Sequence, residues 1–143
     1  MKNSVLHKEY TVIRDDYAGA GKASTDIKRT LNSIGCKPKV LRNIAVAAYE
    51  AEINMIIHAW GGVITMDVYD DGTAGFVFKD PGPGIPDLEF ALTPGCSTAS
   101  EKARSMGFGA GMGLPNIKRV ADEFDIQTGS EGTTLTLAFN GAL

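Results

Sequence analysis

Apolar residues recur along this chain at two different spacings, and the spacing predicts the secondary structure. Alternation with a period of two predicts strands over residues 8–13, 63–69, 74–79, 125–128 and 133–139. Helical spacing predicts helices over 18–34, 38–59 and from Gly113 to about Phe124. Gly35 and the Gly61-Gly62 pair follow the first two helices, at positions where glycine commonly ends a helix.

Two short turns join neighbouring strands of this pattern. Asp70-Asp71-Gly72 separates 63–69 from 74–79, and residues 129–132 separate the last two strands. Strands joined in hairpins predict a mixed, mostly antiparallel sheet, and the helices are expected on one of its faces. The expected fold class is therefore α+β, a two-layer sandwich. No repeat or linker interrupts the chain, so residues 1–143 are expected to form a single domain.

Composition removes several classes of function. The 14 basic and 17 acidic residues give a net charge of −3, which argues against a protein that binds nucleic acid through phosphate contacts. No apolar run approaches the roughly 18 residues of a membrane helix, and the polar start is unlike a signal peptide. Cys36 and Cys96 lie far apart without metal-ligand spacing, as expected for free thiols in the cytoplasm.

The second predicted helix carries polar residues beside its apolar stripe. Glu50 and Asn54 are four residues apart and share a face, and His58 continues the row by one turn. A carboxylate can deprotonate a hydroxyl, and an amide oxygen can bind Mg²⁺. A solvated polar face gives the same pattern, and a lone histidine is commonly a packing residue at a helix end.

Two glycine-rich segments follow. Asp80 ends a strand and is followed by Gly82 and Gly84; an ionised aspartate accepts the hydrogen bonds that an adenine amino group donates. An aspartate that caps a tight turn would look the same. The second segment precedes a helix, whose N-terminus favours anions such as a triphosphate, and contains Gly107, Gly109, Gly111 and Gly113.

Two familiar phosphate-binding motifs do not fit these segments. Met112 stands where the dinucleotide-binding pattern that starts at Gly109 needs glycine, and no strand directly precedes it. Gly21-Lys22 lacks the upstream glycine and the following Ser or Thr of a P-loop. Between the glycine segments, residues 87–106 are mostly small and polar, then charged, which is typical of a functional loop or lid.

Taken in order, the three blocks resemble the GHKL superfamily of gyrase, heat-shock chaperone, histidine-kinase and mismatch-repair ATPases. Glu50 and Asn54 resemble its N box, the segment from Asp80 to Ile85 its G1 box, and 109–113 its G2 box. Gly132-Thr133-Thr134 resembles the adenine-side segment. Within the superfamily the chain is most similar to the small bacterial serine kinases that regulate sigma factors, and to the stressosome switch kinase in particular.

The resemblance implies a set of roles. Glu50 would be the general base that accepts the proton of a partner's serine or threonine, Asn54 would bind Mg²⁺, and Asp80 would accept from adenine, supported by Thr133. Ser97 and Thr98 in the lid would hold phosphates. The remaining ATP contacts would come from the G1 and G2 boxes, namely Gly82, Gly84, Ile85, Gly107, Gly109, Gly111, Met112, Gly113 and Leu114.

The resemblance also implies partners, and it leaves more than one activity open. The phosphorylated protein would be a STAS-domain anti-sigma antagonist, a sigma factor is a second possible partner, and related proteins pair as homodimers. One alternative is an anti-sigma factor that sequesters a sigma factor with little turnover. A further alternative is a detached catalytic domain of a histidine kinase, although the sequence shows no dimerisation helix with a phospho-accepting histidine. The last is a fold that binds ATP without turnover.

Overall fold

The structure is a computed structural model, and it describes residues 2–57, 59–82, 92 and 113–143. Several residues of the sequence-based predictions lie outside the described residues: His58, Gly84, Ile85, Cys96, Ser97, Thr98, Gly107, Gly109, Gly111 and Met112. The predicted lid, 87–106, is also outside them except for Leu92, which packs against the hydrophobic core.

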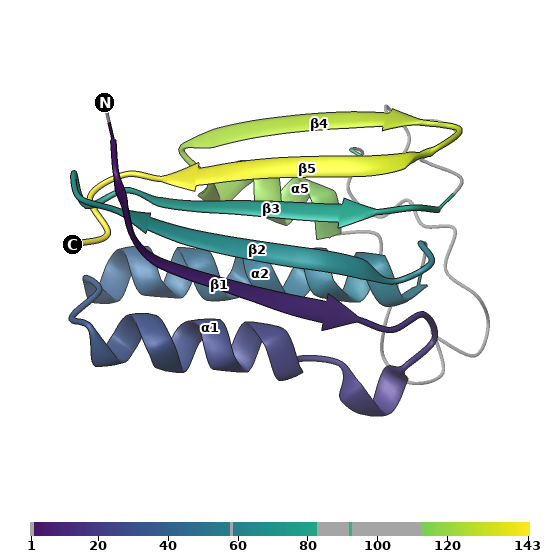
Figure 1. Ribbon diagram of the computed structural model, residues 1–143, viewed down its shortest axis with the longest axis horizontal. Coiled ribbons are helices and arrows are strands. Elements are labelled where there is room, and N and C mark those ends of the chain that lie inside the picture. The colour runs from purple at the N-terminus through teal and green to yellow at the C-terminus, as the bar shows by residue number, and fades with distance from the viewer. Residues whose placement is uncertain (1, 58, 83–91, 93–112) are drawn as a thin grey trace.

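The described elements form one sheet with the helices behind it (Figure 1). The strands are β1 (Ser4–Val12), β2 (Gly62–Tyr69), β3 (Ala74–Asp80), β4 (Glu123–Gly129) and β5 (Gly132–Phe139). The helices are the short 3₁₀ turn η1 (Tyr17–Gly19), then α1 (Lys22–Ser33), α2 (Pro38–Ile57) and α5 (Gly113–Val120). This is the predicted two-layer α+β arrangement.

The sheet order is β1-β2-β3-β5-β4, and each of the four strand pairings found in the described part of the chain is antiparallel. The expectation of a mixed sheet was wrong for this part. β3 and β4 do run in the same direction, because both are antiparallel to β5. They do not pair, since β5 lies between them. In the hairpin of β4 and β5, it is β5 that pairs with β3.

The core lies between the sheet and the helices. Alternate residues of the central strands point toward the helices and are buried, which explains the period of two in the sequence. The ring of Phe76 in β3 meets that of Phe139 in β5 edge-on, with ring centroids 5.8 Å apart. The other strand residues that are almost fully buried are Ile64, Met66, Val68, Ala74, Phe78, Leu135 and Leu137.

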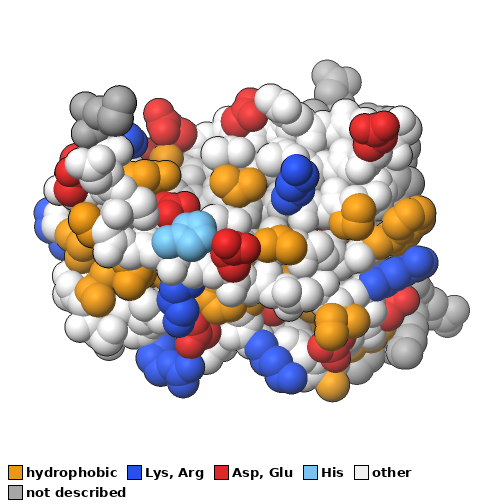
Figure 2. Space-filling model, viewed as in Figure 1, with side chains coloured by type: hydrophobic (Ala, Val, Ile, Leu, Met, Phe, Trp, Pro, Cys, Tyr) orange, Lys and Arg blue, Asp and Glu red, His pale blue; other side chains and the backbone are white. Residues whose placement is uncertain are grey.

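The opposite face of the sheet is open. Figure 2 views this face, where charged and apolar side chains are interspersed. His7 in β1 contacts two carboxylates here, Glu9 at 3.0 Å and Asp67 at 2.7 Å. Hydrogen bonds to Glu9 and Asp67 raise the pKa of His7. No described helix has the length and apolar character needed to span a bilayer.

Three element boundaries differ from the sequence-based predictions by four residues, and others differ by one or two. The first strand begins four residues earlier, at Ser4. The first helix begins at Lys22 and not at residue 18, because Gly21 adopts a positive φ of 91° that interrupts the helix. The last helix ends at Val120, and Phe124 lies in β4 opposite Leu137. The helical spacing of Phe124 was misleading, because a single apolar residue can fit both the helical period of about 3.6 and the strand period of two.

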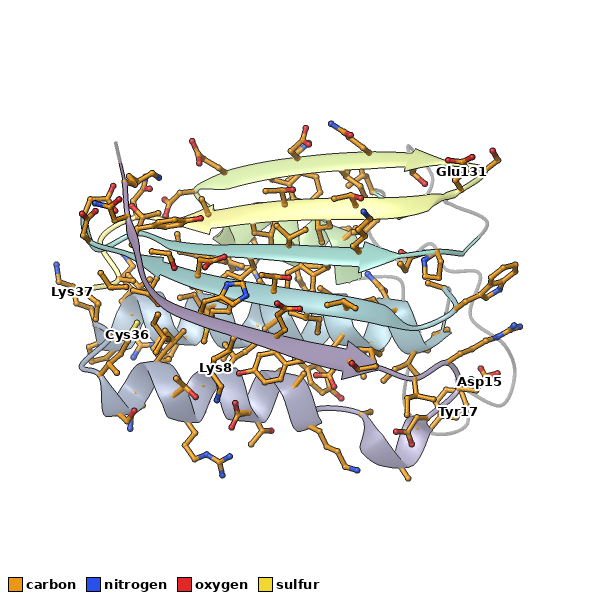
Figure 3. The ribbon with its side chains drawn as sticks, in the orientation of Figure 1. Lys8, Asp15, Tyr17, Cys36, Lys37 and Glu131 are labelled. Carbon is orange, nitrogen blue, oxygen red and sulfur yellow. The ribbon has the colours of Figure 1, made fainter. Side chains whose placement is uncertain are left out.

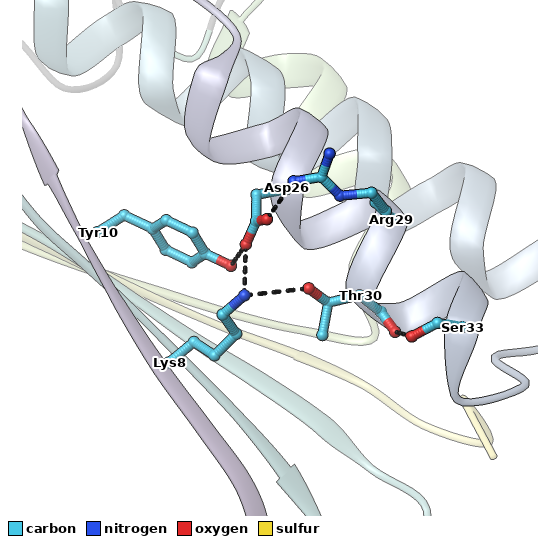
Figure 4. A network of polar contacts seen from close by, with 6 residues as sticks. All are labelled: Lys8, Tyr10, Asp26, Arg29, Thr30 and Ser33. Atoms are coloured by element: carbon cyan, nitrogen blue, oxygen red, sulfur yellow. Dashed lines mark hydrogen bonds and ion pairs between the residues drawn. The ribbon is translucent and has the colours of Figure 1, made fainter.

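Polar contacts fasten α1 to the edge strand β1 (Figure 4). The Asp26 carboxylate accepts from Lys8 Nζ at 2.6 Å, from the Tyr10 hydroxyl at 2.6 Å and from Arg29 at 2.7 Å. Lys8 also donates to Thr30. The bonds from Lys8, Tyr10 and Arg29 hold the pKa of Asp26 far below its usual value. The network therefore orients α1 along β1 at neutral pH, where Asp26 is ionised.

A buried carboxylate fastens α1 to α2. Glu52 is 3% exposed, and one carboxylate oxygen accepts from the backbone N–H groups of Gly21 and Ala23 at 3.2 and 3.3 Å. The other oxygen accepts from the N–H of Ser24 at 3.0 Å. These N–H groups lie at the start of α1, where no carbonyl of the helix can accept from them. A side chain of α2 thus supplies the N-terminal cap that α1 lacks locally.

Glu52→Ala should lower the free energy of unfolding by about 3 kcal/mol, because it leaves buried backbone donors without an acceptor. Urea denaturation at pH 7 measures the change. Glu131→Ala is the control, since Glu131 is an exposed glutamate in the β4–β5 turn. Equal midpoints for the two variants would show that Glu52 does not stabilise the start of α1.

Candidate functional site

Several of the sequence motifs meet at one end of the sandwich. α2 and β3 both finish there and α5 begins there, as the strand and helix directions in Figure 1 show. Figure 3 marks the same end with Asp15, Tyr17 and Glu131, whereas Cys36 and Lys37 lie at the other end. The described candidate residues at this end are Glu50, Asn54, Asp80, Gly82, Gly113, Leu114 and Thr133.

The first residue of α5 packs directly on the polar row of α2. A Cβ atom placed on Gly113 would lie 3.1 Å from Asn54 Oδ1 and 3.3 Å from Glu50 Oε2. These distances are tighter than ordinary carbon–oxygen contacts, so a side chain at Gly113 would displace both polar groups. The N-box pair and the G2-box glycine, which are far apart in the sequence, therefore lie close together in the structure.

Glu50 is partly buried at this contact. Burial raises the pKa of its carboxyl group, and a hydrogen bond from the side chain of Asn116 opposes the rise. Asn116 lies in α5, and the sequence analysis did not select it. Its position three residues after Gly113 places both residues on the same side of that helix, which is the signal that would have found it.

Asp80 lies at the end of β3 and is also partly buried. Burial raises the pKa of its carboxyl group, and hydrogen bonds from the backbone of Gly82 and of Thr133 lower it. The N–H of Gly82 donates to Asp80 Oδ1 over 3.0 Å. The Gly82 N–H thus restrains the orientation of this carboxylate, and an ionised carboxylate has acceptor sites left for a ligand.

The β5 strand completes this part of the site. Thr133 is 9% exposed and lies opposite Asp80 in the β3–β5 register. Its hydroxyl group exchanges a hydrogen bond of 2.8 Å with that of Thr128. Gly132 has a φ of 136°, and a Cβ there would collide with the carbonyl oxygen of Asp80. The absence of a side chain at Gly132 thus allows β5 to approach the end of β3.

The turn after β3 is equally close to the end of α2. A Cβ atom on Gly82 would lie 3.2 Å from the backbone nitrogen of Trp60 and 3.4 Å from the Cα of Ala59. The Trp60 side chain is 52% exposed, and the Arg14 guanidinium lies over its ring at 5.6 Å. At Gly82 the turn therefore lies close to the backbone of Ala59 and Trp60, which follow α2.

The remaining described candidates differ in what they offer a ligand. Leu114 is 8% exposed and its side chain belongs to the core, so it can offer a ligand its backbone. Asn54 is partly exposed and its side chain faces Gly113. No group of three or more His, Cys, Asp or Glu side chains in the described ranges is arranged to hold a metal ion. A cation bound by Asn54 would therefore need other ligands, such as phosphate oxygens or water.

A family model described as "Histidine kinase-like ATPase domain" matches residues 13–139. The chain belongs to this family. The matched residues include every candidate residue named above. Membership in an ATPase-domain family implies that the nucleotide is ATP. Membership agrees with the observed arrangement, in which the N-box helix, the end of β3 and the start of α5 meet.

The similar proteins include a kinase and several anti-sigma factors. The serine/threonine-protein kinase RsbT of Bacillus subtilis is 35% identical over 96 residues, which is 64% of this chain and 66% of RsbT. The anti-sigma F factor of Geobacillus stearothermophilus is 33% identical over 103 residues, 68% of this chain and 67% of that protein. The chain thus spans slightly less than two thirds of the length of RsbT.

Two solved structures share the fold at low sequence identity. The RsbU and RsbW domains of a Mycobacterium tuberculosis protein match with a TM-score of 0.66 and 18% identity, covering 95% of this chain and 32% of that one. A histidine kinase domain of a blue-light activated kinase from Erythrobacter litoralis matches with a TM-score of 0.50 and 13% identity, over 99% and 68%. Both confirm the predicted fold class.

Gly132→Ala should lower the free energy of unfolding by about 2–4 kcal/mol, because alanine is strained at this φ and its Cβ meets the Asp80 carbonyl. Gly129→Ala is a matched control in the same hairpin, where a Cβ would meet nothing within 4 Å. Urea denaturation compares the two variants. If both unfold at the same urea concentration, the close approach of β5 to Asp80 is not what requires glycine.

Proposed function

We propose that this protein is an ATP-dependent serine/threonine protein kinase that phosphorylates a STAS-domain anti-sigma antagonist in the bacterial cytoplasm. The observation that supports the proposal is the closeness of Gly113 to both Glu50 and Asn54, whose side-chain oxygens lie 3.3 and 3.1 Å from the place a Cβ on Gly113 would occupy. It brings a candidate base and a candidate magnesium ligand to the start of a helix. Phosphoryl transfer depends mainly on such positioning and on neutralising charge.

The donor set fits a purine nucleotide with Mg²⁺. Asp80 presents a carboxylate that the Gly82 N–H already orients, as an acceptor for the adenine amino group requires. Thr133 lies opposite and supports this side. Asn54 supplies a neutral oxygen for Mg²⁺. Further nucleotide contacts are proposed from the motif pattern alone, at Gly82, Gly84, Ile85, Ser97, Thr98, Gly107, Gly109, Gly111, Met112, Gly113 and Leu114.

Glu50 is proposed as the general base. Its partial burial raises its pKa, which brings a carboxylate nearer to the range in which a base is both ionised and able to take a proton. Glu50 would accept the hydroxyl proton of the partner's serine or threonine. Bound ATP would supply the γ-phosphoryl group. As the bond between the partner's oxygen and the γ-phosphorus forms, the bond from that phosphorus to the β–γ bridging oxygen would break, and ADP would be released. The backbone at the start of α5 would face the phosphates.

A second function has a specific observation in its favour. The anti-sigma F factor of Geobacillus stearothermophilus is similar to this chain over 68% of its length, which is slightly more than the 64% matched by RsbT. The protein would then bind a sigma factor in a nucleotide-dependent way, with little transfer of phosphate. A sigma factor that co-purifies with the tagged protein, together with no transfer to any STAS-domain protein, would favour this alternative.

Glu50→Ala should lower the rate of phosphoryl transfer at least about 100-fold and leave the dissociation constant for ATP within about twofold, because a base acts on the transition state. The assay mixes radiolabelled ATP, Mg²⁺ and purified STAS-domain proteins from the same genome. Label on a serine or threonine is expected with the wild-type protein. Glu131→Ala is the control, and a fully active Glu50→Ala protein would contradict the general-base role.

Asp80→Asn should weaken ATP binding at least about 10-fold while changing unfolding by less than about 1 kcal/mol, because its new N–H₂ group opposes donors. Inosine triphosphate has a carbonyl group where adenine has an amino group. We expect Asp80→Asn to bind inosine triphosphate at least as well as wild type does, measured by calorimetry. If the substitution weakened the binding of ATP and of inosine triphosphate by the same factor, Asp80 would not bind the adenine amino group.

A further inference from the structure

The helix layer carries a charge opposite in sign to that of the whole chain. α1, α2 and α5 together contain seven Lys and Arg residues and three Asp and Glu residues, a net charge of +4, whereas the whole chain carries −3. The three acids are engaged or covered: Asp26 accepts hydrogen bonds from β1, Glu52 is buried, and Glu50 is partly buried. The surface that these helices present to solvent is therefore basic.

The middle helix of this layer presents one narrow stripe to solvent. α2 packs against both α1 and α5 (Figure 1). Beyond Pro38, its exposed residues are Lys39, Arg42, Val46 and Tyr49, which we call the α2 stripe. They recur every three or four residues, so they share one side of the helix. Two cations are thus followed by a valine and a tyrosine, whose side chains are 39% and 40% exposed.

The cations of this surface are available to a partner. Within the described ranges, the ion pairs of the structure involve neither Lys39 nor Arg42 of the stripe, nor the exposed Lys28 of α1. Lys118 and Arg119 add exposed cations on α5. An acidic surface would meet complementary charge along this layer, and such complementarity speeds encounter and fixes the orientation of two proteins.

The α2 stripe ends beside the candidate base. Tyr49 directly precedes Glu50, whose carboxylate faces Gly113 at the start of α5. A protein that presents a hydroxyl group to Glu50 must also cover surface around it, because a specific interface buries about 800 Å² on each partner. The stripe extends about 15 Å from Lys39 to Tyr49, at a helical rise of about 1.5 Å per residue. An interface of this size, centred near Glu50, therefore reaches along the stripe.

We propose that the α2 stripe is the surface on which the protein substrate docks, and that the substrate meets it with an acidic face. This inference rests on the proposed kinase activity, which defines the substrate. Tyrosine and arginine are enriched among the residues that contribute most to protein interfaces, and an apolar centre with a charged rim is their usual arrangement. Val46 and Tyr49 supply the apolar contact nearest the base, and Lys39 and Arg42 supply charge further along.

An acidic protein fits these observations better than other anionic partners. Nucleic acid binds mainly through many phosphate contacts, whereas half of the stripe is uncharged and the chain as a whole is acidic. A helix that lies on a lipid surface inserts its apolar face, but the apolar face of α2 packs in the protein core. A valine and a tyrosine between cations instead match a protein surface that is acidic and partly apolar.

The first test reverses one charge of the stripe, with the STAS-domain protein that wild type phosphorylates as the substrate. In Arg42→Glu, kcat/KM for that protein should fall at least about 10-fold at low salt, because like charges would then face each other. The turnover number at saturating substrate and the ATP dissociation constant should stay within about twofold of wild type. The difference should narrow as salt screens the charges. Lys2→Glu changes the net charge equally at an exposed site before β1 and should match wild type.

A second pair of variants asks whether the sign of the charge matters at one position. Val46 is the site, because the Tyr49 ring also lies close to Gly21 at the start of α1. Val46→Asp should lower kcat/KM at least about 10-fold, and Val46→Lys should lower it clearly less. Urea denaturation of both variants checks that the fold is kept. Equal losses of rate for aspartate and lysine would overturn the acidic face of the substrate.

A charge swap identifies the facing residue. Each exposed acid of the substrate is changed in turn to lysine, and each variant is assayed with wild type and with Arg42→Glu. At least one should lose rate with wild type and regain it with Arg42→Glu, because the swap restores an opposite-charge pair. If no substrate variant restores the rate, or if Arg42→Glu has wild-type kinetics, the stripe is not the docking surface.

A binding measurement distinguishes failure of this proposal from failure of the kinase assignment. Calorimetry measures the binding of purified STAS-domain proteins in the presence of Mg²⁺ and an ATP analogue that cannot transfer phosphate. If none is phosphorylated, the kinase assignment fails, yet binding that is at least about 10-fold weaker with Arg42→Glu still supports the docking surface. Binding of none of them, or equal binding to both proteins, overturns it. So does binding of a DNA duplex or of phosphatidylglycerol vesicles in their place.

Discussion

The contact between the first residue of α5 and the polar row of α2 is the constraint on which the rest of this site depends. Gly113 has no side chain, and the space a Cβ would take there lies 3.1 Å from Asn54 Oδ1 and 3.3 Å from Glu50 Oε2. A side chain at Gly113 would require these polar groups to shift by a few tenths of an ångström. Because α5 begins at this point, the carboxylate, the amide and the N-terminal N–H groups of a helix share one small region.

Two glutamates of α2 that are close in sequence face two different helices, α5 and α1. Glu50 faces α5, whereas Glu52 is buried and caps the start of α1. Two residues along a helix are separated by about 200° around its axis, which accounts for the opposite directions. The same helix thus holds the candidate base in place and fixes α1, and β1 holds α1 from the other side through Asp26.

The other half of the site depends on how closely β3 and β5 approach. Asp80 ends β3 opposite Thr133, and Gly132 lets the two chains come together. Both candidate acids, Glu50 and Asp80, have pKa values raised by burial and lowered by hydrogen bonds from uncharged amides. The site therefore orients its carboxylates with neutral donors. This leaves their negative charge available to a ligand's donors or to a cation.

Periodicity in the sequence was enough to predict the strands β2, β3 and β5, the long helix α2 and the side of α2 that carries Glu50 and Asn54. These features are local, because the spacing of buried residues repeats within each element. The end of α5 was not predictable in this way, since Phe124 fits either period and its pairing with Leu137 decides between them. The position of β5 between β3 and β4 follows from packing across the sheet. The contact of Glu52 with the start of α1 depends on which helix lies beside α2, and the one-dimensional pattern does not specify neighbours. The sequence by itself determined which groups are available for chemistry, whereas the tertiary structure decided which of them meet, because hydrogen bonds and close contacts form between residues far apart in the chain.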